Sequence, residues 1–239
     1  MIESAVILAA GKGTRMGNLT AETPKPMLPL AGKPMIEHIL DRLRDAGIRR
    51  VLLIVGYRGE SIRAHLAKYP LPIDYVQQPV ASGTGSATLL ARDFCGRDPF
   101  LLTFGDILCS ASDYRGLIAR LDEHAGGVLG VKHVADPARG AAVYEENDQV
   151  VRIVEKPPPG SSTTNWNSAG LYAFRPVLFD ELARIPLSPR GEYELTTAIE
   201  QLIQRGVTLR KYAIADEWMD VGLPEDLAKG EELVRYNGG

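Results

Sequence analysis

The stretch that decides the fold is AVILAAGKGTRM at residues 5–16, which TPKPMLPLAGKP follows at residues 23–34. Its apolar run at 5–10 predicts a short buried strand. Gly11 and Gly13 come directly after that run, where they allow the backbone to turn tightly and to bring its N–H groups within reach of an anion. A strand that ends in such a turn predicts a loop that handles phosphate.

Two cations of different kinds belong to the same stretch. Arg15 offers a planar fork that suits two phosphate oxygens, and Lys25 offers a mobile point charge. Pro24, Pro26 and Pro29 fix φ around the lysine and disfavour a helix before them, so we expect Lys25 on a stiff, extended segment. The pairing favours a triphosphate over a neutral ligand.

The loop does not fit the two best-known phosphate motifs. Gly11 does not begin a GxxxxGK[ST] spacing, and Met16 stands where a dinucleotide fingerprint has its third glycine. Instead, LAAGKGTRM at 8–16 with TPKPMLP at 23–29 closely resembles the signature of the sugar-1-phosphate nucleotidylyltransferases, the family of glucose-1-phosphate thymidylyltransferase and of the uridylyltransferases that make UDP-sugars. The resemblance implies that Arg15 and Lys25 act in catalysis and that the nucleotide is bound by Leu8, Ala10, Gly11, Gly13, Thr14 and Arg15.

Composition limits the class of protein. The 239 residues suit one large α/β domain, and a net charge of −3 without a basic stripe argues against nucleic acid as a partner. Cys95 and Cys109 lack CxxC spacing and are expected to be free thiols, which fits a reducing cytoplasm. No leader pattern and no apolar run long enough to span a bilayer is present, so we expect a cytoplasmic protein with no membrane partner, either a monomer or a small homo-oligomer.

Strands and helices alternate in the first half of the chain. Apolar runs at 51–55, 73–77 and 100–104 are separated by helical patterns near 34–46, 60–68 and from residue 84. From about residue 126, strands follow one another without helices, which indicates mixed or antiparallel pairing, and helices are expected at 176–183, 193–204 and 224–235. We therefore predict an α/β fold: a Rossmann-like, doubly wound, mixed but mainly parallel sheet with helices on both faces. It would form one domain over 1–239, with a nucleotide-binding half at 1–125 and a sugar-binding half at 126–239.

Two aspartates are placed to hold a metal ion. Asp106 follows the apolar strand at 100–104, at the carboxyl end where ligands of such sheets bind, and Asp220 lies in WMDVG at 218–222. By itself, a Gly-Asp pair is found as often in an ordinary turn as in a functional site. Nucleotidyl transfer accumulates negative charge on oxygens, and the resemblance implies that Asp106 and Asp220 hold Mg²⁺, with Asp106 also catalytic.

The nucleobase is expected to contact the segment at 75–87. The amide of Gln78 can donate to and accept from a pyrimidine edge, and Gly83 stands at the five-residue offset found in uridylyl and thymidylyl enzymes. Gln77 is expected to point to the other face of the strand. The match favours UTP or dTTP, with Thr84 also in the nucleotide site, while a surface turn of Gln and Gly residues is the alternative.

The sugar phosphate is expected to bind residues of the second half. Glu155 and Lys156 belong to a Glu-Lys-Pro triplet that the family places at the hexose, and the strand at 167–172 supplies Asn167 and Gly170. The segment GEYELT at 191–196 resembles the helix that closes the hexose pocket. Gly140 is included as well, although it stands where the family has Tyr, so the hexose can differ from glucose.

The leading hypothesis is a Mg²⁺-dependent transferase that joins UTP or dTTP to a sugar 1-phosphate and releases pyrophosphate. One alternative is a noncatalytic nucleotide-sugar sensor on the same fold, and another is a pyrimidine transferase with a nonsugar acceptor. A dehydrogenase is disfavoured because its glycine spacing is missing and because no acidic residue follows the strand at 51–55.

Overall fold

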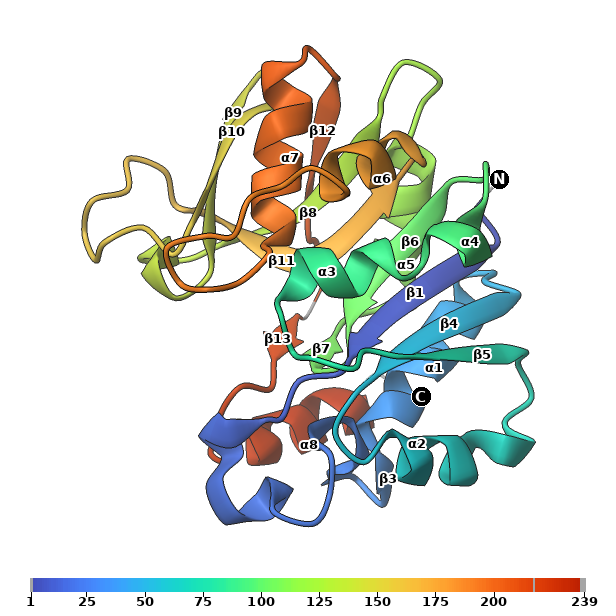
Figure 1. Ribbon diagram of the computed structural model, residues 1–239. Coiled ribbons are helices and arrows are strands. Elements are labelled where there is room, and N and C mark those ends of the chain that lie inside the picture. Colours follow the sequence, from blue (N-terminus) through green and yellow to red (C-terminus); the bar gives the residue numbers. More distant parts are fainter. Residues whose placement is uncertain (1, 217, 237–239) are drawn as a thin grey trace.

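The computed structural model describes residues 2–216 and 218–236 (Figure 1). Its strands are β1 (Ser4–Ala9), β2 (Pro29–Leu30), β3 (Lys33–Pro34), β4 (Arg50–Val55), β5 (Ile73–Gln77), β6 (Phe100–Phe104), β7 (Ile107–Leu108), β8 (Gly127–His133), β9 (Ala141–Glu146), β10 (Gln149–Glu155), β11 (Trp166–Phe174), β12 (Leu209–Ala213) and β13 (Met219–Asp220). Its α-helices are α1 (Met35–Asp45), α2 (Gly59–His65), α3 (Thr84–Leu89), α4 (Arg92–Cys95), α5 (Ala111–Arg120), α6 (Val177–Leu182), α7 (Leu195–Gln204) and α8 (Asp226–Tyr236).

Nine strands form the main sheet, in the order β5-β4-β1-β6-β11-β8-β12-β10-β9. The pairs β5–β4, β4–β1 and β1–β6 are parallel, as the alternation of strands and helices predicts. The prediction of a mainly parallel sheet is wrong, however, because beyond β6 only β12 and β8 pair in parallel. For β9 and β10 the physical reason is local: they are joined by Asn147 and Asp148, both at positive φ, and a two-residue turn of this kind links only antiparallel strands.

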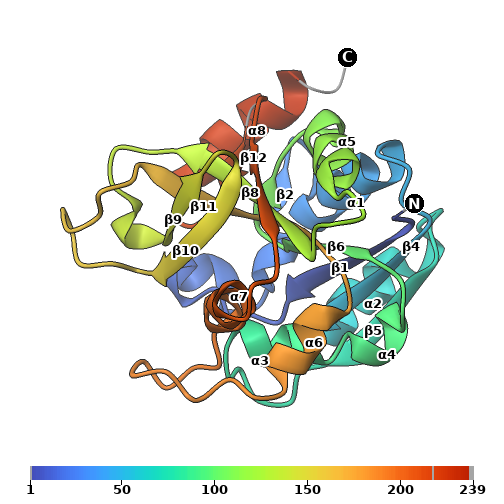
Figure 2. The same ribbon diagram turned by 90° about the horizontal axis from the view of Figure 1, so that it is seen from above.

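Helices cover both faces of the sheet, as predicted (Figures 1 and 2). Side chains alternate along each strand, so Ile7 of β1 belongs to the core cluster that includes residues of α1, α2 and α5, whereas its neighbour Val6 belongs to the cluster that includes residues of α3, α6 and α7. The two cysteines are free and buried. Within the described residues, no helix combines the length and the apolar character needed to cross a membrane.

The sheet brings separate loops to one edge. Leu8 of β1 lies beside Phe104 of β6, and the Gly105 N–H donates to the Leu8 carbonyl oxygen at 2.9 Å, so the glycine loop and Asp106 are neighbours. The short ribbon of β7 and β13 pairs Ile107 with Asp220. Three segments that are far apart in the sequence therefore meet where β1 and β6 end.

Candidate active site

The glycine loop is organised by Gly13. This residue has φ +65°, and a Cβ built on it would lie 3.0 Å from the Cβ of Lys25, so the close approach of the two segments requires glycine. Thr20 donates from Oγ1 to the Gly13 carbonyl oxygen at 2.9 Å. Gly11 was expected to share in the turn but does not have a positive φ, and an added methyl there would meet no atom of the described chain. The conformation of the turn therefore depends on Gly13, and the absence of a side chain at Gly11 leaves open space beside the loop.

Lys25 is buried beside Asp106. It begins a three-residue 3₁₀ helix, Lys25–Met27, so the expected extended conformation is wrong. Pro24 before it is extended, but the Leu28 N–H donates to the Lys25 carbonyl oxygen at 3.1 Å and closes a turn. The Lys25 ammonium lies 2.5 Å from Asp106 Oδ2, with the lysine side chain 8% exposed. A short turn with three prolines nearby still holds this cation in one place.

Asp106, directly before β7, and Asp220 of β13 line the same cavity, since β13 pairs Asp220 with Ile107 of β7. Although Asp220 opens to the cavity, the surrounding protein and then the charge of Asp106 raise its pKa to about 6, against the opposing charges of Lys25 and Arg15. A bound cation would reduce the repulsion between these two carboxylates. Carboxylate oxygens suit Mg²⁺, which keeps waters and phosphate oxygens as its other ligands. The described residues contain no cluster of three or more metal-ligating side chains, so such a site would use these two.

Arg15 lies near Asp220, beside Gly222. Gly222 leaves room there: a Cβ built on it would lie 3.5 Å from Arg15 Nη1 and 3.6 Å from Asp220 Oδ1. Among the residues that the structure describes, neither Arg15 nor Lys156 forms an ion pair, although both line the cavity. Two cations without carboxylate partners are therefore free to meet an anionic ligand.

The cavity at the carboxyl ends of β1 and β6 has a volume of about 520 Å³. It collects most of the predicted site residues in one place: Leu8, Ala10, Gly11, Gly13, Thr14, Arg15, Lys25, Gln78, Gly83, Thr84, Asp106, Lys156 and Asp220. A smaller cavity of about 150 Å³ adjoins it and is lined by the other four, Gly140, Glu155, Asn167 and Gly170. The two cavities share Thr84 and Asp220. One continuous site thus receives residues from both halves of the chain.

In the wall of the larger cavity, Gln78 is buried and its Nε2 donates to the Gly83 carbonyl oxygen at 3.2 Å and to Ser86 Oγ at 3.1 Å. Gln77 points elsewhere, as predicted, and donates to the Gly56 carbonyl oxygen at 3.1 Å. The Gln78 side chain is thus held in the cavity wall by the turn that it faces.

Around the smaller cavity, the backbone has a positive φ at two of the residues predicted from the sequence. Gly170 has φ +70° and interrupts the pairing of β11 with β8, and a Cβ there would lie 2.8 Å from the Phe104 ring. A Cβ at Gly140 would lie 2.2 Å from Asn167 Oδ1, an oxygen that is buried without a hydrogen-bond partner. Lys156 has the unfavourable φ of +41°, and its N–H donates to the Gly140 carbonyl oxygen at 2.7 Å. Such strain is typical of functional sites.

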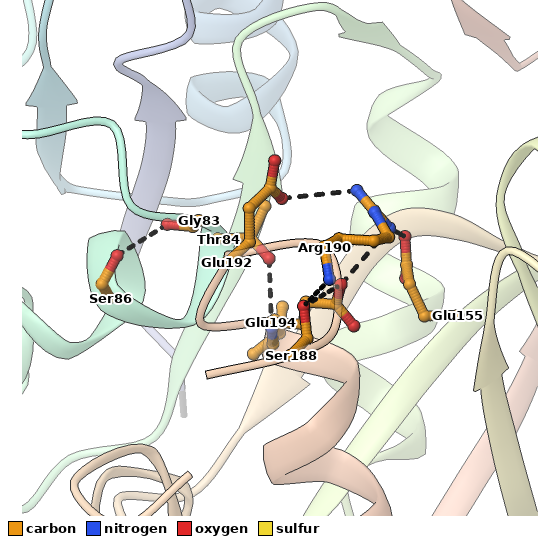
Figure 3. Close-up of polar contacts among 9 residues, drawn as sticks. Gly83, Thr84, Ser86, Glu155, Ser188, Arg190, Glu192 and Glu194 are labelled. Carbon is orange, nitrogen blue, oxygen red and sulfur yellow. Dashed lines mark hydrogen bonds and ion pairs between the residues drawn. The ribbon is translucent and has the colours of Figure 1, made fainter. Parts of the chain in front are cut away.

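Sequence reasoning missed Arg190, which lines the larger cavity together with Glu192 of the GEYELT segment. Figure 3 shows Arg190 pointing toward Glu155, at 3.1 Å from its Oε1, and toward Glu194, at 3.3 Å. Burial raises the pKa of the Glu155 carboxyl, against the hydrogen bond from Arg190, which lowers it. The only signal was the position of Arg190 directly before the GEYELT segment.

A hydrogen bond outside the cavity holds the chain at Ala21, directly after the 3₁₀ segment Thr14–Thr20 that follows Gly13. The Tyr57 hydroxyl donates to the Ala21 carbonyl oxygen at 2.5 Å and accepts from Arg58 Nε at 2.9 Å. We expect Tyr57→Phe to weaken the binding of pyrophosphate, used as an anionic probe of this loop, by up to about fivefold, since one hydrogen bond contributes about 1 kcal/mol, and to lower the melting temperature by only a few degrees. Calorimetric titration with Tyr75→Phe as the matched control checks this. A Kd equal to that of the wild type would show that the loop does not depend on this bond.

Comparison with known proteins agrees with this geometry. The family model for nucleotidyl transferases matches residues 4–236. The chain is 32% identical to the low-salt glycan biosynthesis nucleotidyltransferase Agl11 of Haloferax volcanii over 96% of its own length and 65% of that protein. It is 36% identical to the UTP–glucose-1-phosphate uridylyltransferase AglF of the same organism, over 97% of this chain and 96% of AglF.

A solved structure entitled a putative glucose-1-phosphate thymidylyltransferase from Bacillus anthracis superimposes with a TM-score of 0.87 at 27% identity, covering 98% of this chain and 96% of that one. The chain spans less than two thirds of the length of the first curated relatives that it matches, as with Agl11. On the match of the family model over nearly all of its length, the chain belongs to the nucleotidyl transferase family.

Proposed function

We propose that the protein transfers a nucleotidyl group from UTP or dTTP to a sugar 1-phosphate, giving a nucleotide sugar and pyrophosphate. The observation that carries this proposal is the position of the Lys25, Asp106 and Asp220 centre. All three residues line the larger cavity together with Gln78 and Lys156, and Asp220 also lines the smaller cavity together with Glu155. A nucleoside triphosphate bound beside Gln78, the base end, and a sugar phosphate bound beside Glu155, the sugar end, would meet at the charged centre.

The residues have distinct tasks in this proposal. Asp106 and Asp220 would hold Mg²⁺, which when bound neutralises phosphate charge and orients phosphate oxygens. Arg15 would bind the departing pyrophosphate by its guanidinium fork, and Lys25 would stabilise the charge at the reacting phosphates. Lys156 would hold the sugar phosphate, and Glu155 would accept hydrogen bonds from sugar hydroxyls. The chain itself supplies position and charge, which are the main demands of phosphoryl chemistry.

The choice of base rests on Gln78, whose buried amide lines the cavity next to Gly83. The names of the relatives support a pyrimidine, since AglF is named for UTP and the Bacillus anthracis protein for a thymidylyl group. We further propose that nucleotide binding belongs to residues 1–125 and sugar binding to 126–239 of one domain. A cytoplasmic protein that is a monomer or a small homo-oligomer is part of the same proposal.

A substrate panel tests the function. Purified protein with Mg²⁺ is incubated with each of UTP, dTTP, CTP, GTP and ATP and with several sugar 1-phosphates, and pyrophosphate release is followed. We expect release with UTP or dTTP. Binding of nucleotide sugars without any release would favour the noncatalytic sensor, and release only with phosphocholine or another nonsugar phosphate would favour the nonsugar transferase.

A further inference from the structure

The turn that is proposed to bind the base also contacts a loop of the sugar end. We call residues 78–85 the base turn and residues 186–194 the sugar loop. We propose that the base turn is the platform that positions the sugar loop, with Gly83 and Gly85 as positioning residues for sugar-phosphate binding. This inference rests on the proposed function and adds to it that the two substrate ends are energetically coupled.

The contact between the two segments is made by the backbone. The Tyr193 N–H donates to the Ser82 carbonyl oxygen at 2.8 Å, and the Gly85 N–H donates to the Tyr193 carbonyl oxygen at 2.7 Å. Directly after the loop, the Leu195 N–H donates to Thr84 Oγ1 at 3.0 Å, which joins the first turns of α3 and α7. Figure 3 shows the sugar loop beside Gly83 and Thr84. Three hydrogen bonds in sequence fix the end of the sugar loop to the base turn.

The glycines of the base turn are explained by this contact without any ligand. Gly83 has φ +111°, and a Cβ built on it would lie 2.4 Å from the Tyr193 carbonyl oxygen. A Cβ on Gly85 would lie 2.9 Å from the same oxygen and 2.7 Å from Ile185 Cδ1. Backbone atoms of the sugar loop therefore fill the space in which side chains would stand.

The middle of the sugar loop places the charged side chain of Arg190 at the larger cavity. Arg190 bridges Glu155 of β10 and Glu194, and Ser188 Oγ donates to Glu194 Oε1 at 2.9 Å. The loop's own large side chains hold it only weakly, since Leu187 is 55% exposed and Tyr193 is 38% exposed. Its position depends instead on the backbone bonds to the base turn and on Arg190. A displacement at Gly85 is thus transmitted over a few residues to Arg190 and Glu155.

Coupling of this kind is reciprocal. If order in the base turn improves the geometry of the sugar loop, a ligand at either end strengthens binding at the other by the same factor. The sugar end is affected even when no nucleotide is bound, because the contact belongs to the protein and not to the ligands. This distinguishes the platform from direct contact between the two substrates.

Gly85→Ala tests the platform, because Gly85 does not line either cavity and its helical φ accepts alanine. We expect this variant to bind glucose 1-phosphate about tenfold more weakly than the wild type in the absence of nucleotide, with a smaller loss in UTP binding. Gly230→Ala in α8 is the matched control, since its added Cβ would make only an ordinary contact, 3.4 Å from Leu30 Cδ2. Both ligands are titrated calorimetrically against each protein.

Hydrogen exchange of the unliganded and liganded wild type gives a reading that does not depend on a variant. Glucose 1-phosphate alone should slow exchange of the Gly85 and Tyr193 amides, and Gly85→Ala should speed exchange across the sugar loop. An unchanged affinity for glucose 1-phosphate in Gly85→Ala, or a loss confined to UTP, would overturn the platform. If the wild type binds neither UTP nor dTTP and none of the sugar 1-phosphates of the substrate panel, the proposed function fails, and the exchange of Gly85→Ala still reports whether the base turn holds the loop.

Discussion

Asp106→Asn should reduce kcat by about two to three orders of magnitude while UTP still binds. The substitution keeps the size of the side chain and removes one negative charge from the centre that Asp106 forms with Asp220 and Lys25. Interactions that stabilise charge at the reacting atoms are each associated with losses of about 10²–10³ in kcat when they are removed. Nucleotide binding depends mostly on other groups, the base turn and Arg15, so we expect the Kd for UTP to rise by less than about tenfold.

Pyrophosphate release and calorimetric titration with UTP check this result. Asp93→Asn is the control, because Asp93 is exposed on α4 and lines neither cavity. Both variants should melt within a few degrees of the wild type, so that a loss of turnover is not a loss of fold. Turnover that is undiminished in Asp106→Asn would remove Asp106 from the catalytic centre.

The residues of this centre could be predicted from the sequence because each lies in a short local motif. The glycine loop follows a strand, Asp106 follows another, and parallel strands that are neighbours place such loops at one edge. The resemblance to a known family added Asp220, whose neighbour Ile107 is 113 positions away in the chain and which no local pattern connects to Asp106. The sequence could therefore predict the polar residues that directly follow strands of the parallel part of the sheet.

Of the parts that were not predicted, one has a local signal in the sequence and the others depend on contacts that are distant in the sequence. Helix α5 was not predicted, although Ser110 accepts a hydrogen bond from the Asp113 N–H, and a Ser-x-x-Asp spacing is a helix-start signal that could have found it. Strand β12 has no such signal: it is short and carries Arg210 and Lys211, and its place between β8 and β10 comes from pairing alone. The same holds for the sugar loop, since nothing near Gly83 in the sequence points to Tyr193.

Lys25→Met is the second substitution with a large expected effect. It keeps much of the length and apolar character of the side chain but leaves Asp106 and Asp220 without their nearest ammonium group. We expect kcat to fall about a hundredfold, as on removal of one group that stabilises charge at the reaction centre. Lys25→Arg should not restore activity, because a planar guanidinium differs in shape from an ammonium in a side-chain site that is only 8% exposed. Steady-state kinetics on both variants checks these expectations, and an active Lys25→Met would assign the lysine to the fold alone.

The free energy of unfolding shows whether the ion pair of Lys25 and Asp106 serves the fold or the reaction. Breaking a buried ion pair on one side leaves an uncompensated charge, whereas removing both charges does not. Because Asp106 is 27% exposed, we expect each of Lys25→Met and Asp106→Asn to lower the free energy of unfolding by only about 2 kcal/mol. The double variant should lie within about 1 kcal/mol of the wild type but remain inactive. Urea unfolding of the four proteins measures this cycle. If the double variant regained turnover together with stability, the pair would serve folding only, and the charges of Lys25 and Asp106 would have no part in the chemistry.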